Sequence, residues 1–200
     1  MIDEGYVKFE CDWTRGPAPE GIADLVEARN RLRRVNLIGI YEDSGIGFGN
    51  ISQRIAGTDK FVISGTATGG LVTAGAEHFC VVDDWDLQRN HVSCTGPVAA
   101  SSESMTHAML YRVAPDIQYV VHVHHAQLWA EMLKNGPSTD PSVAYGTPEM
   151  ALEMERMTSN EFTGPIKILA MAGHDEGILA FGVKLGEIVG KIIRTSKGKK

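Results

Sequence analysis

Hydrophobic positions change their spacing after about the first fifty residues. Over residues 19–35 they recur at intervals that put them on one face of a helix, which Pro19 is suited to open. The apolar residues of this face are Ile22, Leu25, Val26, Leu32 and Val35. A glycine-rich break over residues 43–49 follows. Short apolar runs between glycine-rich turns then predict strands over 61–63 and 79–82.

The rest of the chain alternates between helical and extended patterns. Prolines at 115 and 137 end two of the predicted helices, and Thr147 with Pro148 forms a suitable start for another. The pattern predicts helices over 102–114 and 126–134, from 148 and from about 184, and strands over 117–124, 166–171 and 178–181, the last two forming a hairpin. Together these elements predict one α/β domain over residues 19–195, between an irregular segment over 1–18 and a basic tail over 196–200.

Composition narrows the class of protein. Hydrophobic residues make up 43% and charged residues 22%, as in globular chains. A formal net charge of −6 argues against a general nucleic-acid surface. No apolar run reaches the roughly 18 residues of a membrane helix, and the N-terminus lacks the pattern of a secretory signal. The three cysteines form no CxxC pair, so we expect a cytoplasmic protein. From the charge and the apolar runs we expect neither nucleic-acid nor membrane partners.

Two histidines on the predicted strand over 117–124 are the first candidates for chemistry. Side chains of a strand alternate between its faces, so His122 and His124 point to one side, while Val123 and His125 point away. Two imidazoles on one face can converge on a metal ion at about 2.0–2.1 Å. Such a pair is equally compatible with half-buried histidines satisfied by hydrogen bonds.

A third histidine favours the metal interpretation. His174 lies in a glycine-bearing turn over 171–178, from which its side chain can reach into a site. Three neutral imidazoles with an open coordination position are typical of a catalytic zinc site. An alternative ligand set replaces one of them with Asp175 or Glu176, although turn carboxylates are more often simply solvated.

Glu103 and the two serines before it lie at the predicted start of a helix. Free backbone N–H groups there, with the hydroxyls of Ser101 and Ser102, suit an anion such as phosphate. Ordinary capping of the helix by serine is at least as good an explanation. His107 lies one turn after Glu103, and we expect it to pack or to orient that carboxylate.

Two glycine-bearing loops add to the anion interpretation. The stretches 47–52 and 64–70 both expose backbone amides and small donors of the kind that form anion nests. Neither matches a P-loop or the dinucleotide fingerprint. Each loop alone is a weak signal.

Taken in chain order, these pieces resemble the class II aldolase/adducin family over roughly residues 20–195. The matching stretches are Gly49-Asn50-Ile51-Ser52-x-Arg54, Ile63-Ser64-Gly65-Thr66, Ser101-Ser102-Glu103-x3-His107-x3-Tyr111, Val120-Val121-His122-x-His124, Tyr145-Gly146-Thr147, and His174 ahead of Gly177-Ile178-Leu179-Ala180. The resemblance implies a three-layer α/β/α sandwich around a largely antiparallel sheet. It also implies a small-molecule substrate and a homo-oligomer, commonly a tetramer with active sites between subunits.

The resemblance also implies roles for individual residues. His122, His124 and His174 would bind zinc or another divalent metal, and Glu103 would be the acid/base residue. The pocket for a phosphate or equivalent anion would be formed by Gly49, Asn50, Thr66, Ser101 and Ser102. The chain departs from the family pattern in having two extra residues between His174 and the next glycine, and in ending soon after its last helix.

These implications lead to a specific functional hypothesis. We expect a metal-dependent lyase of the aldolase type that cleaves or forms a C–C bond in a small hydroxy-carbonyl compound, with or without a phosphate group, through a metal-stabilised enolate. The same site could serve a sugar-phosphate epimerase, a dehydratase or a decarboxylase, since a fold does not fix its chemistry. A non-catalytic adducin-like binding module is the alternative from another class.

Overall fold

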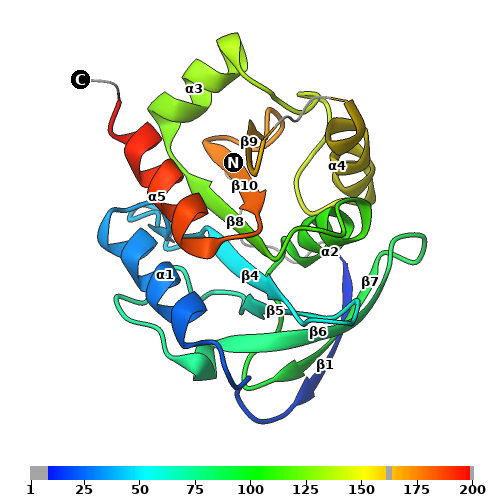
Figure 1. The fold of residues 1–200 in the computed structure, drawn as a ribbon. Coiled ribbons are helices and arrows are strands. Elements are labelled where there is room, and N and C mark those ends of the chain that lie inside the picture. Colours follow the sequence, from blue (N-terminus) through cyan, green and yellow to red (C-terminus); the bar gives the residue numbers. More distant parts are fainter. Residues whose placement is uncertain (1–8, 161–163, 199–200) are drawn as a thin grey trace.

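The computed structural model describes residues 9–160 and 164–198, and it shows one large sheet with helices on both faces (Figure 1). The strand order of this eight-stranded sheet is β1-β7-β6-β5-β4-β8-β10-β9, and only the β1–β7 pair is parallel. Its strands are β1 (Glu10–Arg15), β4 (Asn50–Arg54), β5 (Phe61–Ser64), β6 (Phe79–Asp86), β7 (His91–Gly96), β8 (Tyr119–His124), β9 (Ile166–Ala170) and β10 (Gly177–Gly182). Two short strands, β2 (Gly39–Ile40) and β3 (Gly47–Phe48), pair separately, and a 3₁₀ turn spans Ala76–His78.

The helices form two layers with a separate hydrophobic core under each. On one face lie α1 (Ala23–Arg34), α3 (Ala126–Asn135) and α5 (Leu185–Ser196), and on the other lie α2 (Ser104–Val113) and α4 (Pro148–Asn160). Aliphatic side chains such as Leu25, Leu32 and Ile192 fill the first core. Methionines of α2 and α4 contribute much of the second. This arrangement confirms the expected α/β/α sandwich with a largely antiparallel sheet.

Strand β8 lies inside the sheet and separates the two cores. Its side chains alternate as expected: Val121 and Val123 pack into the core beneath α1, α3 and α5. Val120 packs into the opposite core, on the side of α2 and α4. His122 and His124 therefore project toward α2 and α4, and both are buried.

The expectation of an irregular segment over 1–18 is wrong for Glu10–Arg15. These residues form the edge strand β1, which pairs in parallel with β7, so they belong to the same sheet as the rest of the chain. Five of the six residues are exposed, which explains why no hydrophobic pattern announces the strand. Residues 1–8 lie outside the described part of the chain.

The first helix begins at Ala23 and not at Pro19. Gly21 adopts a left-handed backbone conformation with φ of +71°, which interrupts a helix, so the helical pattern takes effect only after it. Helix α2 likewise begins two residues later than expected, because Ser102 and Glu103 form a turn ahead of it. At the C-terminal end α5 includes Ser196, and residues 199–200 of the expected basic tail lie outside the described residues.

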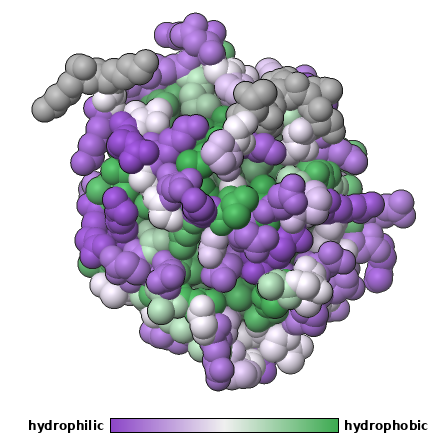
Figure 2. Space-filling view, viewed as in Figure 1, coloured by the Kyte–Doolittle hydropathy of each residue, from purple (hydrophilic) through white to green (hydrophobic). Residues whose placement is uncertain are grey.

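The surface is mixed in polarity. The face in Figure 2 carries many hydrophilic side chains with smaller apolar areas among them. Exposed large apolar residues include Val72, Leu152 and Val183. None of the helices in the described ranges has the length and apolar character needed to cross a membrane.

Candidate metal centre

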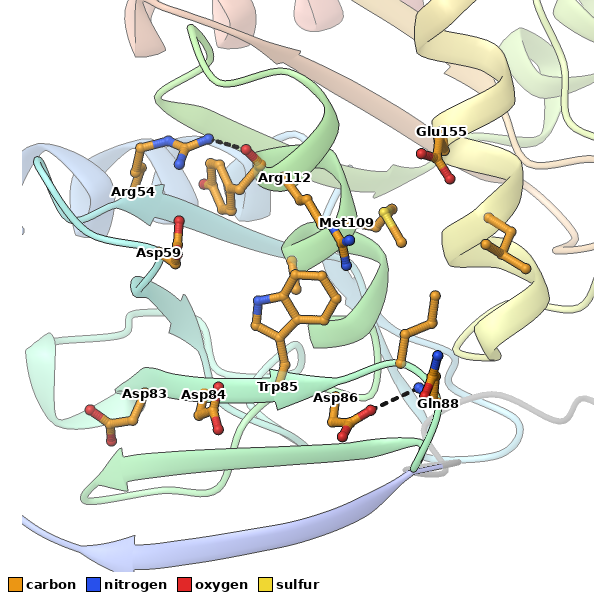
Figure 3. A pocket seen from close by; sticks show the side chains of 14 residues that line it. Arg54, Asp59, Asp83, Asp84, Trp85, Asp86, Gln88, Met109, Arg112 and Glu155 are labelled. Atoms are coloured by element: carbon orange, nitrogen blue, oxygen red, sulfur yellow. Dashed lines mark hydrogen bonds between the residues drawn. The ribbon is translucent and has the colours of Figure 1, made fainter.

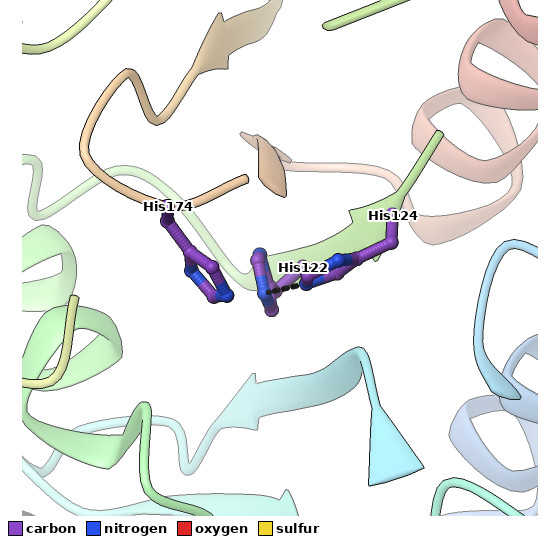
Figure 4. Close-up of side chains that lie close together, drawn as sticks. All are labelled: His122, His124 and His174. Carbon is purple, nitrogen blue, oxygen red and sulfur yellow. Dashed lines mark hydrogen bonds between the residues drawn. The ribbon is translucent and has the colours of Figure 1, made fainter. Parts of the chain in front are cut away.

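His122, His124 and His174 meet on the α2/α4 side of the sheet. The first two come from β8 and the third from the turn between β9 and β10, as Figure 4 shows. Their potential ligand nitrogens all lie within 4.8 Å of one another, and the three side chains are buried. The Nε2 atoms of His122 and His124 are 3.1 Å apart. The structure therefore brings together the three histidines that the sequence singled out.

Each of the three rings is held by a contact behind it, and for His122 this contact determines which nitrogen faces the other histidines. Nδ1 of His122 lies 3.2 Å from the carbonyl oxygen of Ile178. Because a carbonyl only accepts, this Nδ1 carries the proton and Nε2 keeps its lone pair toward the other histidines. Nδ1 of His124 lies 2.8 Å from the hydroxyl of Tyr41. His174 stacks on Tyr145, with ring centroids 4.1 Å apart and planes at 24°.

Burial keeps the imidazoles of His122 and His124 neutral. It lowers the pKa of His122 and of His124 well below the usual value, and the neighbouring histidines lower the pKa of both further. Neutral imidazole is the form that binds metals, so protons compete weakly for these ligands. The buried set of neutral nitrogen donors is suited to zinc or a similar divalent ion.

The alternative ligands Asp175 and Glu176 are not part of this group among the described residues. Asp175 is exposed. Glu176 instead accepts a hydrogen bond from the Tyr41 hydroxyl through Oε2, at 3.3 Å. As a metal site, the three histidines would leave a coordination position open, as in catalytic zinc sites.

Glu103 lies beside the histidines, in the turn that leads into α2. It is 2% exposed, and its Oε1 is 3.7 Å from Nδ1 of His174. The turn is held by Ser101, whose carbonyl accepts from both the backbone N–H and the hydroxyl of Ser104. A buried carboxylate at this distance from the ligand group can exchange protons with a molecule bound there.

The expected anion-binding residues line the same pocket as the histidines and Glu103. Its walls include Gly49, Asn50, Thr66, Ser101 and Ser102, and its volume is about 40 Å³. Asn50 lies directly across from His122 in the β4–β8 register. Its buried Oδ1 has no hydrogen-bond partner within the described ranges, which leaves an acceptor for a bound molecule.

Three aromatic residues near the histidines carried no expected role. Tyr41, Phe48 and Tyr145 contact the ligand rings: the centroids of Phe48 and His124 are 5.2 Å apart, for example. Tyr41 lies just before the glycine-rich break and Phe48 lies within it, where no periodicity marks a residue as inward-facing. Only the stretch around Tyr145 could have been identified, through its resemblance to the family motif.

Two other histidines have structural roles. His125 caps α3, its Nδ1 accepting from the backbone N–H of Leu128 at 3.1 Å, so it points away from the metal ligands as expected. His107 is fully buried in α2, with Nδ1 2.7 Å from the hydroxyl of Ser52. That hydroxyl is also 2.7 Å from the hydroxyl of Tyr111. His107 thus packs behind the site.

The glycine-rich loop after β5 is held by a buried arginine of α1. The guanidinium of Arg29 donates to the carbonyl oxygens of Thr68 at 2.6 Å, Gly69 at 3.1 Å and Leu71 at 2.7 Å. Burial lowers its pKa to about 10. Thr68 and Gly69 line the pocket, so Arg29 fixes part of its wall from behind.

A larger cavity lies elsewhere, between β6, α2 and α4. Its volume is about 680 Å³, and Figure 3 shows Trp85 in its middle, between the aspartates of β6 and Arg112. The guanidinium of Arg112 is 5.8 Å from the centroid of the Trp85 ring. Asp83 accepts from Lys60 and Asp86 accepts from the backbone of the following turn, so these carboxylates serve the local structure. The cavity does not contain the histidines.

Solved structures share this fold. The chain is similar to an L-fuculose 1-phosphate aldolase (TM-score 0.63, 18% identity, covering 90% of this chain and 85% of that one). It is also similar to a sugar-phosphate aldolase from Thermotoga maritima (TM-score 0.65, 17% identity, 88% and 90%). A third is YgbL from Escherichia coli, described as a putative aldolase/epimerase/decarboxylase (TM-score 0.63, 15% identity, 87% and 84%). At these identities the likeness concerns the fold.

Sequence comparison identifies the family. A search of curated protein sequences gives no match. The family model described as class II aldolase and adducin N-terminal domain matches residues 43–195, a stretch that includes the three histidines, Glu103 and the loops that line the pocket. The chain belongs to the class II aldolase and adducin N-terminal domain family.

Proposed function

We propose that the protein is a metal-dependent lyase of the aldolase type, acting on a small hydroxy-carbonyl compound. The observation that supports this most directly is the buried group of His122, His124 and His174 beside the carboxylate of Glu103. Zinc is the ion that such a donor set suits best, although another divalent metal could occupy it. When bound, the ion would supply Lewis-acid polarisation of a carbonyl group.

The residues around the ion would bind the substrate and move its proton. Glu103 would act as the acid/base group, since its carboxylate lies in the same pocket and is screened from water. The hydroxyls of Ser101 and Ser102, the side chain of Thr66, the amide of Asn50 and the backbone at Gly49 would hold an anionic or polar end of the substrate. Burial of the pocket would exclude bulk water and strengthen each of these contacts.

The biological setting is part of the same proposal. The chain has three cysteines, an odd number, and they are widely spaced, which favours the reducing cytoplasm. We propose a homo-oligomer, specifically the tetramer that the family resemblance implies. A neighbouring subunit would enlarge the walls of the pocket, which is small in one chain. Light scattering of the purified protein tests this oligomeric state.

A substitution of the carboxylate tests the proposed reaction. Glu103→Gln keeps the size of the side chain and removes its ability to take up a proton, so we expect about one divalent ion per chain and no measurable turnover. Elemental analysis and aldehyde release from a panel of keto-sugar phosphates measure the two quantities. A metal-free preparation that is as active as the metal-loaded enzyme would reject the proposal.

Other reactions at the same site are the second candidate. The Escherichia coli YgbL structure carries the description aldolase/epimerase/decarboxylase, and its fold resembles this one as closely as that of the L-fuculose 1-phosphate aldolase does. Product analysis on the same panel separates the candidates, because isomer formation indicates epimerisation and CO₂ release indicates decarboxylation. An adducin-like binding module would have no need for the buried histidine group.

A further inference from the structure

Tyr41 connects one of the candidate metal ligands to a carboxylate. It follows β2, and its hydroxyl lies 2.8 Å from Nδ1 of His124 and 3.3 Å from Oε2 of Glu176. The ring of Tyr41 packs against Phe48, with centroids 4.7 Å apart, and Phe48 in turn packs against His124. The hydroxyl is therefore held between the histidine and the carboxylate by ring packing as well as by hydrogen bonds.

Glu176 adopts a backbone conformation that a glutamate rarely takes. Its φ is +63°, in the left-handed region, which costs a non-glycine residue roughly 1–2 kcal/mol. Its carbonyl oxygen accepts from the backbone N–H of His125 at 3.0 Å, at the end of β8, so the residue is held in place beside the site. Strained residues of this kind concentrate at functional sites.

The direction of these hydrogen bonds determines the tautomer of His124. A carboxylate only accepts, so Tyr41 donates its proton to Glu176 and offers its oxygen to Nδ1–H of His124. In this tautomer Nε2 of His124 carries the lone pair of the ring and lies against Nε2 of His122. Without the carboxylate, Tyr41 can donate to Nδ1 instead, and the proton on Nε2 can then bond to His122 across the 3.1 Å contact. That second tautomer has no lone pair for a metal at Nε2.

We propose that Glu176 and Tyr41 are positioning residues that keep His124 in its metal-binding tautomer. The inference rests on the proposed function, because it assigns to the histidine group the ion named there. Removing a hydrogen-bond partner of a metal-ligating histidine typically weakens metal affinity by about 10–100-fold. Glu176 thereby has a use as a hydrogen-bond acceptor, although it is not a ligand.

Metal affinity in four variants tests the proposal. Zn²⁺ is titrated in competition with a chromophoric chelator into the wild type, Tyr41→Phe, Glu176→Gln, Glu176→Gly and the double variant Tyr41→Phe/Glu176→Gly. We expect Tyr41→Phe and Glu176→Gly, which break the chain of hydrogen bonds, to weaken zinc binding by about 10–100-fold. Glu176→Gln keeps an amide oxygen that can accept from Tyr41, so its affinity should stay closer to that of the wild type. The double variant should bind no more weakly than the weaker single variant, because the two residues act through one chain of hydrogen bonds. Asp175→Asn, an exposed neighbour in the same turn, is the matched control and should stay within about twofold of the wild type.

Two further measurements separate this role from a structural one and from failure of the proposed function. Glycine relieves the left-handed backbone, so Glu176→Gly should not lower the Tm of the metal-free protein even though it weakens zinc binding. Nitrogen NMR of the metal-free protein should show His124 shifting from the Nδ1–H to the Nε2–H form in Glu176→Gly, which has no side-chain acceptor for Tyr41. A wild type that binds no divalent ion refutes the proposed function. The NMR measurement then still tests whether Glu176 and Tyr41 set the tautomer of His124. An unchanged tautomer in Glu176→Gly, or zinc affinities of Tyr41→Phe and Glu176→Gly within twofold of the wild type, overturns the inference.

Discussion

His107 illustrates how burial sets the charge of a single side chain near the site. The ring is fully enclosed, and burial together with the nearby His122 lowers its pKa well below the usual value. The folded protein therefore keeps this imidazole neutral at a pH where the unfolded chain would protonate it. The stability contributed by the neutral ring, which contacts Ser52, is therefore present above the pKa that His107 has in the unfolded chain, and it decreases as the pH falls below that pKa.

We expect the metal-free protein to lose stability as the pH falls below about 6.5, the usual pKa of histidine in the unfolded chain. The unfolded state binds more protons in this range, so the free energy of unfolding decreases with falling pH, by up to about 1.4 kcal/mol per pH unit for each such histidine. His122 and His124 act in the same direction. Urea unfolding at pH 7.5, 6.5 and 5.5 measures the slope, which should be smaller in His107→Asn by about the share of one histidine. An equal slope in both proteins would contradict the assignment.

Arg29 is a second residue whose contribution can be isolated. Replacing it with methionine removes its hydrogen bonds to three loop carbonyls while keeping most of its apolar contacts. Bonds to a charged group are worth about 1.5–3 kcal/mol each, and some of the loss is recovered by solvation, so we expect Arg29→Met to lower the free energy of unfolding by roughly 3 kcal/mol. Arg31→Met, at an exposed position of the same helix, should change it by less than about 0.5 kcal/mol. Chemical denaturation of both variants makes the comparison.

At the scale of elements, the turn between β9 and β10 positions the third histidine. A Cβ atom at Gly177 would approach Cγ of His174 to 3.0 Å and its Nδ1 to 3.1 Å, which is tighter than ordinary packing. The backbone there needs no positive φ, so the glycine is required for the space that the ring occupies.

Gly177→Ala should therefore displace the His174 ring and weaken divalent-metal binding by about tenfold. This is the lower end of the loss of metal affinity, about 10–100-fold, that is typical when groups supporting a ligand histidine are changed. Isothermal titration with Zn²⁺ measures the change. Gly186→Ala is the control, because a Cβ there meets no atom within 4 Å and alanine favours the helix by about 0.5–1 kcal/mol. Gly186→Ala should leave zinc binding unchanged. Equal zinc affinity in Gly177→Ala and the wild type would show that the ring has room to adjust.

Elements differ in how completely the sequence predicts them. The alternation of β8 is a local property with period two, and for this reason it correctly placed His122 and His124 together and His125 elsewhere. Strand β1 could not be predicted, because it lies at an edge with little apolar burial and pairs with a strand about 80 residues later. The start of α1 was misplaced since the left-handed backbone of Gly21 leaves no mark in the hydrophobic pattern.

The candidate site shows the same division between local and distant information. Strand alternation paired His122 with His124, and the resemblance to the family motifs joined His174 and Glu103 to them. Tyr41 was missed because its hydrogen bonds join positions 83 and 135 residues apart, and only the folded chain brings those positions together. The roles of Gly49, Asn50, Thr66, Ser101 and Ser102 in binding an anion stay predictions, although all five line one pocket.

At the scale of the whole molecule, the histidine group joins segments that are far apart in the chain. An ion held there would link β8 to the turn after β9, and it would bind the folded state but not the unfolded one. We therefore expect metal binding to raise the free energy of unfolding of the whole domain.

With free Zn²⁺ at about 100 times its Kd, the free energy of unfolding should rise by about 2.7 kcal/mol. Thermal melts with added Zn²⁺ and with EDTA measure the difference. His174→Ala should abolish it, whereas His91→Ala, on a strand far from the group in sheet order, should preserve it. Identical melts of the wild type in Zn²⁺ and EDTA would contradict metal binding at this site.

The small volume of the histidine pocket has a consequence for selectivity. About 40 Å³ accommodates roughly three water-sized groups, so only the reacting end of a substrate would be enclosed by this chain. The remainder of such a molecule would lie beyond these walls, where the chain imposes few steric demands. Compounds that share one reactive end but differ in length would then compete on nearly equal terms, and discrimination among them would depend on whatever surface lies against the pocket mouth.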